Sequence, residues 1–309
     1  MRVLAFDTSN YTTSVACFDG REGHNISRLL DVAPGALGLR QSDALFSHVK
    51  RLPELADRLF SDFGQDKICA IGASTRPRAV EGSYMPCFLA GQSQAQVMAS
   101  ALGVPFYAFS HQQGHIAASL FSSDHMELMD EPHLAWHLSG GTTELLYVTP
   151  DGLNVHAEKI GGTTDISAGQ LIDRTGQLLE LPFPAGKALD ALSQNATDKT
   201  IFRIKVKGTE FSLSGVQNKV QEYHKGYAVE TAAYALRCLI GAIVEATKNA
   251  LKQYPHCKVV FAGGVASNSL LRKKCESLPA IFCPGQYATD NALGTAVLTW
   301  RIHHGTAHL

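Results

Sequence analysis

The fold is decided by two stretches with the same layout, VLAFDTSNYTTSVACF at residues 3–18 and LAWHLSGGTTELLYV at residues 134–148. Each reads as an apolar strand, a short polar turn rich in Ser, Thr or Gly, and a second apolar strand. Such a turn exposes backbone N–H groups and hydroxyls that suit a phosphate. A third turn, AGGVASN at residues 262–268, leads from a strand into a helix, and helix N-termini also attract phosphates. The three turns predict two similar lobes that bind one nucleotide.

Strands and long helices are mixed along the rest of the chain. Apolar alternation and β-branched residues predict strands at residues 3–6, 14–18, 70–74, 134–138, 145–148, 155–160 and 259–262. Helical spacing predicts helices at residues 42–60, 88–102, 111–121, 166–179, 229–253, 269–277 and 290–300. This mixture is typical of an α/β protein in which helices cover sheets.

Length and composition are those of a globular chain. The 309 residues, 45% hydrophobic and 18% charged, suffice for two domains that each bury a core. The apolar runs are too short to cross a bilayer, and the N-terminal MRVLAFDTS enters a strand pattern without room for a signal peptide. Seven scattered cysteines without a CxxC pair indicate reduced thiols. We therefore expect a cytoplasmic protein with no membrane partner.

The charge balance gives little attraction for nucleic acid. The net charge is −1, from 27 basic and 28 acidic residues, so no overall field draws a polyanion to the surface. Two short basic stretches, residues 199–207 and 272–274, are either local nucleic-acid contacts or solvated faces. Binding of a large RNA would therefore need help from partners.

Two histidines have the spacing of metal ligands. His111 and His115 lie four residues apart, which on a helix places both imidazoles on one face. Taken alone, the pair fits a metal site and a solvated helix face equally well. A zinc protease of the helical HExxH type would need a glutamate directly after His111, and that position is Gln112. The sequence therefore disfavours proteolysis by that mechanism.

Other polar residues have both an ordinary and a functional interpretation. Asp290 precedes the last predicted helix, where it could be an N-cap or a third metal ligand. Asp173 and Gly186 could be ordinary helix and turn residues. Asn268 follows the third glycine turn and could donate to a ribose or a base.

In chain order, seven segments resemble one family, the tRNA threonylcarbamoyladenosine biosynthesis transferases. These TsaD-like proteins were formerly labelled O-sialoglycoprotein endopeptidases. The resemblance spans nearly the whole chain and rests on FDTSNYTTSVA, SHQQGHIAA, HLSGGTTEL, DISAGQLIDRTGQLLELPFPAGK, FSLSGVQNK, FAGGVASNSLLR and CPGQYATDNALGTA. It implies an α/β fold of two actin-like, sugar-kinase-like ATPase lobes with a nucleotide cleft between them. The first lobe would comprise residues 1–107 and 290–309, and the second residues 108–289.

The resemblance also implies the cofactors and the site. His111, His115 and Asp290 would bind one divalent metal, iron or zinc. ATP or an adenylate would contact His137, Leu138, Ser139, Gly140, Gly141, Asp173, Gly186 and Asn268. The implied reaction is transfer of a threonylcarbamoyl group from its adenylate to N6 of the adenosine beside the tRNA anticodon. The implied partners are a related actin-like subunit or a second copy, and tRNA bound with the help of partners.

Several positions differ from the family pattern. Tyr11 and Thr12 stand where the family has an acidic pair, and Asp7 replaces a glutamate. A glycine-proline-glycine turn is replaced by Arg76-Pro77-Arg78, a histidine by Thr142, and the glutamate between the metal-site histidines by Gln113. Three functions therefore stay open: a divergent transferase, a nucleotide-binding partner or regulator without transfer activity, and carbamoyl or acyl transfer to a small molecule.

Overall fold

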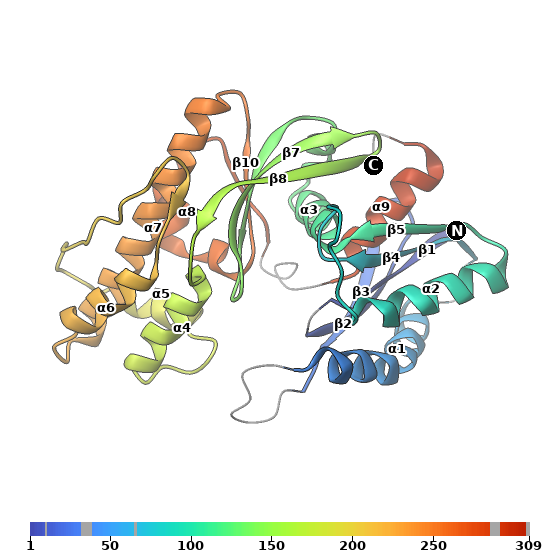
Figure 1. The fold of residues 1–309 in the computed structure, drawn as a ribbon, viewed down its shortest axis with the longest axis horizontal. Helices are drawn as coiled ribbons and strands as arrows, with labels where there is room; N and C mark the ends of the chain where they lie inside the picture. Colours follow the sequence, from blue (N-terminus) through green and yellow to red (C-terminus); the bar gives the residue numbers. More distant parts are fainter. Residues whose placement is uncertain (10, 32–38, 65–66, 285–290, 307–309) are drawn as a thin grey trace. The chain divides into compact units, whose positions relative to one another are not determined.

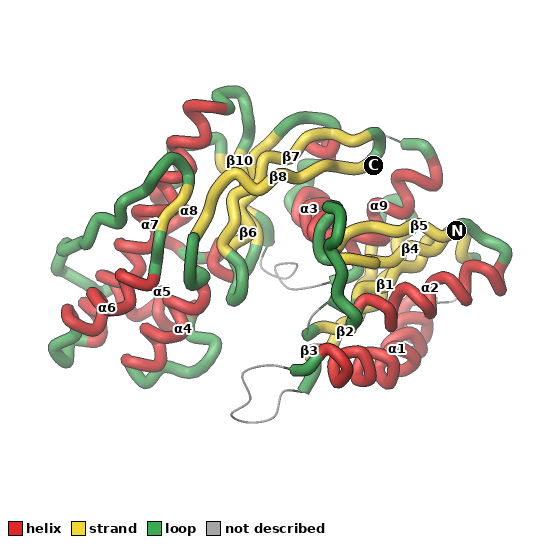
Figure 2. The backbone as a smooth tube through the Cα atoms, viewed as in Figure 1, coloured by secondary structure: helices red, strands yellow, loops and turns green. Residues whose placement is uncertain are grey.

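The computed structural model describes the whole chain except residues 10, 32–38, 65–66, 285–290 and 307–309. The chain folds into two compact units with one β-sheet each (Figures 1 and 2). Unit 1 comprises Met1–Glu131, Thr149–Ala157 and the described residues from 291 onward. Unit 2 comprises Pro132–Val148 and the described residues from 158 to 284. Among the described helices, none combines the length and the apolar character needed to span a membrane.

The sheet of unit 1 has the strand order β3-β2-β1-β4-β5. Its strands are β1 (Arg2–Asp7), β2 (Thr12–Phe18), β3 (Gly23–Leu29), β4 (Ile68–Arg76) and β5 (Phe106–Ser110). β1, β2 and β3 form an antiparallel meander, whereas β4 runs parallel to β1 and β5 parallel to β4. Every residue of β2 is buried, as expected of a strand covered by helices on both faces.

Four helices cover this sheet. α1 (Gln41–Phe63) and α2 (Phe88–Leu102) lie on one face, and α3 (His111–Ser122) and α9 (Leu293–His304) lie on the other (Figure 1). A short 3-10 helix, η1 (Met126–Met129), follows α3. The core between the sheet and the first helix pair includes Leu4, Phe6, Leu55, Leu59 and Ile71.

The sheet of unit 2 has the order β11-β10-β6-β7-β8-β9. Its strands are β6 (His133–Leu138), β7 (Thr143–Asp151), β8 (Asn154–Thr163), β9 (Glu210–Phe211), β10 (Val259–Ala262) and β11 (Ala280–Phe282). β6 and β7 are antiparallel, and β10 runs parallel to both β6 and β11. The order β8-β7-β6-β10-β11 thus repeats β3-β2-β1-β4-β5, which confirms the two similar lobes predicted from the repeated layout.

The helices of unit 2 gather around one long central helix. They are α4 (Ala168–Leu178), α5 (Gly186–Ser193), α6 (Ser214–Tyr223), α7 (Ala228–Gln253), η2 (Gly264–Ser267) and α8 (Ser269–Lys274). α7 packs against α4, α5, α6 and α8, as Figure 2 shows. Its buried face, with Leu236, Leu239 and Ile243, joins Trp136 of β6 in the core of the unit.

The division into units differs from the expected one at residues 108–131, which the structure places in unit 1. α3 and α9 approach so closely that a Cβ on Gly294 would lie 1.8 Å from the Gly114 carbonyl oxygen. The tip of the β7–β8 hairpin also joins unit 1, because Val155 and Leu153 accept hydrogen bonds from Gln113 and Arg301. Contacts between segments distant in sequence therefore place residues 108–131 with unit 1, whereas the family resemblance implied a boundary after residue 107.

Each of the predicted strands and helices overlaps an element of the structure, and eight described elements were not predicted. The unpredicted elements are β3, β5, β9, β11, α5, α6, η1 and η2. β3 lies at the edge of its sheet and is half-buried or exposed throughout, so its sequence GHNISRL lacks the apolar alternation of a covered strand. The last predicted helix begins at Leu293 in the structure.

Candidate functional site

The turn between β6 and β7 forms one wall of a candidate site in unit 2. The Ser139 N–H donates to the Thr142 carbonyl at 2.9 Å, and the Thr142 N–H donates to the Ser139 hydroxyl at 3.0 Å. These two bonds close the turn on itself and leave Gly140 and Gly141 exposed at its tip. The turn is thus rigid and carries no side chain where a phosphate oxygen would approach.

The N-terminus of α4 packs directly beneath this turn. Ser167 caps the helix in a reciprocal pair with Gln170, and its hydroxyl also donates to the Gly140 carbonyl. The Ala168 N–H donates to the Thr143 hydroxyl at 2.7 Å. A Cβ on Gly169 would lie 2.4 Å from the Gly140 Cα, so only glycine allows this approach. The partial positive charge of a helix N-terminus therefore lies next to the glycine turn.

A second glycine turn follows β10. Gly263 has a φ of +96°, and a Cβ there would lie 2.2 Å from the Leu138 carbonyl oxygen. The turn leads through η2 to Asn268, whose side-chain oxygen accepts from the Leu271 N–H at 3.1 Å and caps α8. The Asn268 amide donates to Asp190 at 2.9 Å. Asn268 is therefore held in place from both ends of its amide.

Asp173 and Asp190 organise the floor of the site. Asp173 lies on α4 and accepts from the Ala185 N–H at 2.9 Å, which fixes the turn before α5 and hence Gly186. Asp190, one turn farther along α5, accepts from the Ser269 hydroxyl at 2.8 Å and from the Ser269 N–H at 3.0 Å. These carboxylates link α4 to α5 and α5 to α8.

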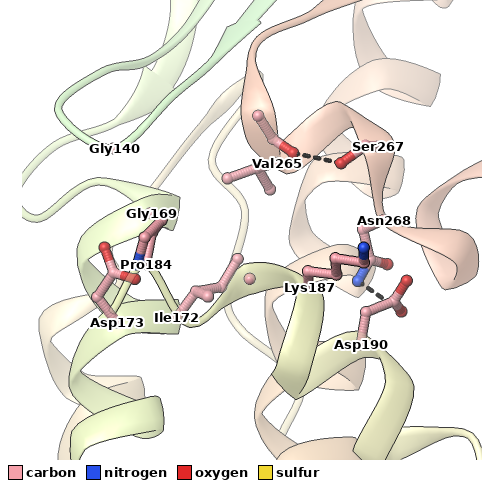
Figure 3. A pocket seen from close by; sticks show the side chains of 12 residues that line it. Gly140, Gly169, Ile172, Asp173, Pro184, Lys187, Asp190, Val265, Ser267 and Asn268 are labelled. Atoms are coloured by element: carbon pink, nitrogen blue, oxygen red, sulfur yellow. Dashed lines mark hydrogen bonds between the residues drawn. The ribbon is translucent and has the colours of Figure 1, made fainter. Parts of the chain in front are cut away.

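These elements enclose a cavity of about 510 Å³ (Figure 3). Its lining combines backbone at glycine turns with two carboxylates, one lysine, one amide and apolar side chains. The lining residues are Gly140, Gly169, Ile172, Asp173, Pro184, Gly186, Lys187, Asp190, Gly264, Val265, Ser267 and Asn268. Figure 3 shows the Asn268–Asp190 hydrogen bond at one side of the cavity and Asp173 at the other. A few polar groups around apolar walls are characteristic of a small-molecule site.

The structure brings together four of the eight residues expected to contact the nucleotide: Gly140, Asp173, Gly186 and Asn268 line the same cavity. Ser139 and Gly141 belong to the adjacent turn without lining the cavity. His137 is half-buried on β6, and the Leu138 side chain is fully buried in the core.

Three further lining residues, Gly169, Lys187 and Asp190, were not predicted from the sequence. The capping pair Ser167 and Gln170 is a sequence signal for the start of α4, and it would have drawn attention to Gly169. Nothing local marks Asp190, because its partners are almost eighty residues away along the chain.

A second candidate site lies in unit 1, where α3 begins. Ser110 caps α3 in a reciprocal pair with Gln113. On this helix, the ring centroids of His111 and His115 lie 4.2 Å apart. The His111 Nδ1 lies 2.8 Å from a carboxylate oxygen of Asp7, the last residue of β1. A carboxylate that accepts a hydrogen bond from Nδ1 fixes the imidazole orientation, as is usual for metal-binding histidines. Asp290, the third expected ligand, lies outside the described residues.

Asp7 is fully buried, and its pKa is lowered. Burial alone would raise the pKa, but the charge of His111 and hydrogen bonds from His111, Ser74 and Ser9 outweigh that effect. The Ser74 hydroxyl donates at 2.5 Å and the Ser9 N–H at 2.9 Å. Asp7 is therefore held as a carboxylate beside the histidine pair.

The structure shows what several divergent residues do. Gln113 is buried, and its amide donates to the Val155 carbonyl at 2.9 Å, which makes it part of the packing of α3. Thr12 is buried at the start of β2, and Thr142 belongs to the glycine turn. Arg76 and Arg78 are exposed at and just beyond the end of β4.

The repeated sheet order defines the class of protein, an actin-like ATPase fold. Two solved structures share it at 14% sequence identity: full-length HypF in its phosphate- and nucleotide-bound form, with a TM-score of 0.62, and HypF from T. kodakarensis, with a TM-score of 0.63. They align with 99% and 98% of this chain, whereas this chain covers 47% of each HypF chain.

The chain belongs to the TsaD family, tRNA N6-adenosine threonylcarbamoyltransferase, whose profile matches residues 38–297. Proteins of that name from Carboxydothermus hydrogenoformans and Thermus thermophilus are 33% and 32% identical to it. The first alignment covers 94% of this chain and 89% of the relative, and the second covers 98% and 93%. The family resemblance stated from the sequence motifs is confirmed.

Proposed function

We propose that this chain transfers a threonylcarbamoyl group from its adenylate to N6 of the adenosine beside the tRNA anticodon, as a divergent member of its family. The observation that carries the proposal is the cavity of unit 2. Gly140, Asp173, Gly186 and Asn268 come from four separate segments, and all four line this cavity. Convergence of the expected nucleotide contacts on one cavity supports binding of an adenylate.

The lining of the cavity offers a complementary group for each part of an adenylate. The N-terminus of α4 and the bare Gly140 turn suit the phosphate. The carboxylates of Asp173 and Asp190 can accept from ribose hydroxyls, and Ile172 and Val265 provide apolar surface for a base. Lys187 is a positively charged side chain in the lining and favours an anionic ligand.

The histidine pair of unit 1 fits a resident divalent metal. His111 and His115 share one helix face, and the Asp7 carboxylate holds the His111 Nδ1, which directs Nε2 toward a ligand position. We propose His111, His115 and Asp290 as the ligands of iron or zinc. The metal, when bound, would act as a Lewis acid that polarises an oxygen of the substrate.

The proposed reaction replaces an acyl–phosphate bond with an acyl–nitrogen bond. The N6 amine forms a bond to the carbonyl carbon, the bond from that carbon to the phosphate oxygen breaks, and AMP leaves with the electron pair. The residues around the cavity would orient the adenylate and limit water around it, which favours transfer over hydrolysis. The amine proton passes to solvent or to a base outside the residues assigned above.

Partners are part of the proposal. Leu29 of β3 and Phe46 and Val49 of α1 are large apolar side chains with 66%, 65% and 45% exposure on neighbouring elements of unit 1. Such a surface suits a related actin-like subunit or a second copy of this chain. Because the near-neutral net charge gives little attraction for a polyanion, we propose that tRNA is bound with the help of such partners in the cytoplasm.

One observation favours a second candidate function, a nucleotide-binding partner without transfer activity. Tyr11 and Thr12 supply no carboxylate at the first polar turn, and Thr12 is buried. In that case the cavity would bind ATP and the chain would act through protein contacts. The exposed Arg76 and Arg78 would suit a third function, transfer to a small acidic acceptor.

To test the proposal, the purified chain is loaded with metal and mixed with candidate partner subunits. Threonylcarbamoyl-adenylate and unmodified tRNA are then added. Mass spectrometry of the digested tRNA measures the modified nucleoside. Its formation, and its loss in Asp173→Ala with the matched variant Asp151→Ala still active, is the expected result. Tight ATP binding with no transfer would favour the partner function, and consumption of the adenylate only with a small acid would favour the third.

A further inference from the structure

A cysteine and two histidines come together in unit 1, outside the sites described above. Cys69 lies on β4, and His303 and His304 end α9. One ligand atom from each residue lies within 4.8 Å of the other two. We propose that Cys69, His303 and His304 form a surface site for a zinc-type divalent cation, separate from the His111 and His115 pair.

Zinc would draw the three ligand atoms closer together than the 4.8 Å within which they lie. Tetrahedral bonds of about 2.0–2.3 Å place neighbouring ligand atoms roughly 3.3–3.6 Å apart. His304 is exposed, whereas Cys69 and His303 are half-buried, so small side-chain rotations can close the remaining gap without moving the core. The three side chains therefore need little rearrangement to bind an ion.

Both imidazoles are held in an orientation that suits a metal ligand. The His304 Nδ1 lies 3.2 Å from the Trp300 carbonyl oxygen, and its ring stacks on the Trp300 ring with centroids 3.9 Å apart. The His303 Nδ1 lies 3.4 Å from the Tyr107 hydroxyl. Because the Trp300 carbonyl can only accept, the His304 Nδ1 donates to it and the His304 Nε2 keeps the lone pair that a metal needs, whereas the Tyr107 hydroxyl can donate to or accept from the His303 Nδ1.

The chemistry of the three donors selects the class of ion. A thiolate with two neutral imidazoles suits zinc and other borderline or soft divalent ions better than magnesium or calcium. The Cys69 thiol would release its proton to solvent when the metal binds.

Cys69, His303 and His304 would fill three of the four ligand positions of a tetrahedral ion. Three protein ligands leave a fourth position for water or for a group from another molecule. Of the seven cysteines, all within the described residues, six are buried and Cys69 alone is half-buried. Cys69 is therefore the thiol that an ion from solvent can reach.

Cobalt provides a direct test, because thiolate coordination to Co²⁺ gives a charge-transfer absorption in the near ultraviolet. The chain carrying His111→Ala and His115→Ala removes the other proposed metal pair and is titrated with Co²⁺. We expect one equivalent with a thiolate band that Zn²⁺ displaces. Cys69→Ser should abolish the band, and His304→Ala should weaken binding by more than the roughly 10–100-fold that loss of an outer-shell partner costs.

The matched control is His125→Ala, which removes another histidine of unit 1 and should leave the titration unchanged. A second measurement needs no variant at the site: Zn²⁺ should slow alkylation of Cys69, as mapped by peptide mass spectrometry. The proposal is overturned if no thiolate band forms, if the band persists in Cys69→Ser, or if Zn²⁺ leaves the alkylation rate of Cys69 unchanged.

Discussion

Asp7 and His111 connect the end of β1 to the start of α3 through a contact of 2.8 Å between a carboxylate oxygen and the imidazole Nδ1. The two residues are 104 positions apart in the chain. The contact joins the first polar turn of unit 1 to the histidine pair. It makes Asp7 a positioning residue for His111 in the proposed metal site.

The first prediction concerns this contact. Asp7→Asn removes the charge that orients His111 and should lower the affinity of the His111 and His115 site for Zn²⁺ or Fe²⁺ about 10–100-fold. Competition with a chromophoric chelator measures the affinity, in a Cys69→Ser background that removes the second proposed site. Asp43→Asn, which changes an exposed carboxylate of α1, is the matched control. Equal affinity in the two variants would contradict the role of Asp7.

Asp190 carries the second prediction. Its carboxylate holds Asn268 and Ser269 with three hydrogen bonds of 2.8–3.0 Å. Asp190→Ala should let the start of α8 move away from the cavity and lower ATP affinity about tenfold, equivalent to roughly 1.4 kcal/mol. Calorimetric titration with ATP tests this, with the exposed Glu276→Ala as the control. Unchanged affinity would show that the side of the cavity lined by Asn268 does not contact the nucleotide.

Alanine substitutions at Gly169 and Gly140 should affect the free energy of unfolding differently. An alanine Cβ at residue 169 would collide with the Gly140 backbone, so Gly169→Ala should destabilise the protein by about 1–3 kcal/mol and also weaken ATP binding. A Cβ on Gly140 would meet no heavy atom within 4 Å. Gly140→Ala should therefore weaken ATP binding without changing the free energy of unfolding. Urea unfolding and ATP titration of both variants separate the two effects. Full ATP affinity in Gly140→Ala would place the phosphate elsewhere.

The free energy of unfolding should vary with pH in a way that reveals the hydrogen-bonded pair of Asp198 and Tyr223 in unit 2. Hydrogen bonds from Thr200 and Tyr223 lower the pKa of Asp198 to about 2, and the bond to Asp198 raises the pKa of Tyr223 to about 12. The lowered pKa means that stabilisation by Asp198 is complete above about pH 4 and is lost toward pH 2. The raised pKa means that stabilisation by Tyr223 is complete below about pH 10 and is lost as the pH rises through 12.

The measurement is urea unfolding of the wild type and Tyr223→Phe over a pH series. The difference in free energy of unfolding should be constant from about pH 5 to 9 and should shrink on both sides of that range. Tyr227→Phe, at an exposed position next to the start of α7, should show no such profile. A difference that does not vary with pH would mean that the pair is not coupled in solution.

The sequence was most informative where a signal is local. The strand, turn and strand layout at residues 3–18 and 134–148 predicted the two similar lobes, and most long helices were found because their apolar spacing is regular. The edge strand β3 was missed because an exposed strand has no apolar alternation to detect. The nucleotide residues came from matching motifs, and four of them line one cavity.

The parts that the sequence did not reveal depend on contacts between distant segments. Asp7 beside His111, Asp190 beside Asn268, and Cys69 beside His303 each join residues 78 or more positions apart. Contacts of this kind follow from the packed fold, and nothing in the local spacing marks them. Contacts of the same kind place residues 108–131 in unit 1, beyond the expected first lobe.

The proposed transfer can be measured in cells depleted of their own family transferase, where partners and tRNA are present. The chain is expressed, and threonylcarbamoyladenosine in bulk tRNA is measured by mass spectrometry. We predict that the wild type restores the modification and that His111→Ala does not. Absence of the modification, with the wild-type protein folded, metal-loaded and bound to the cell's partner subunits, would contradict the proposed transfer.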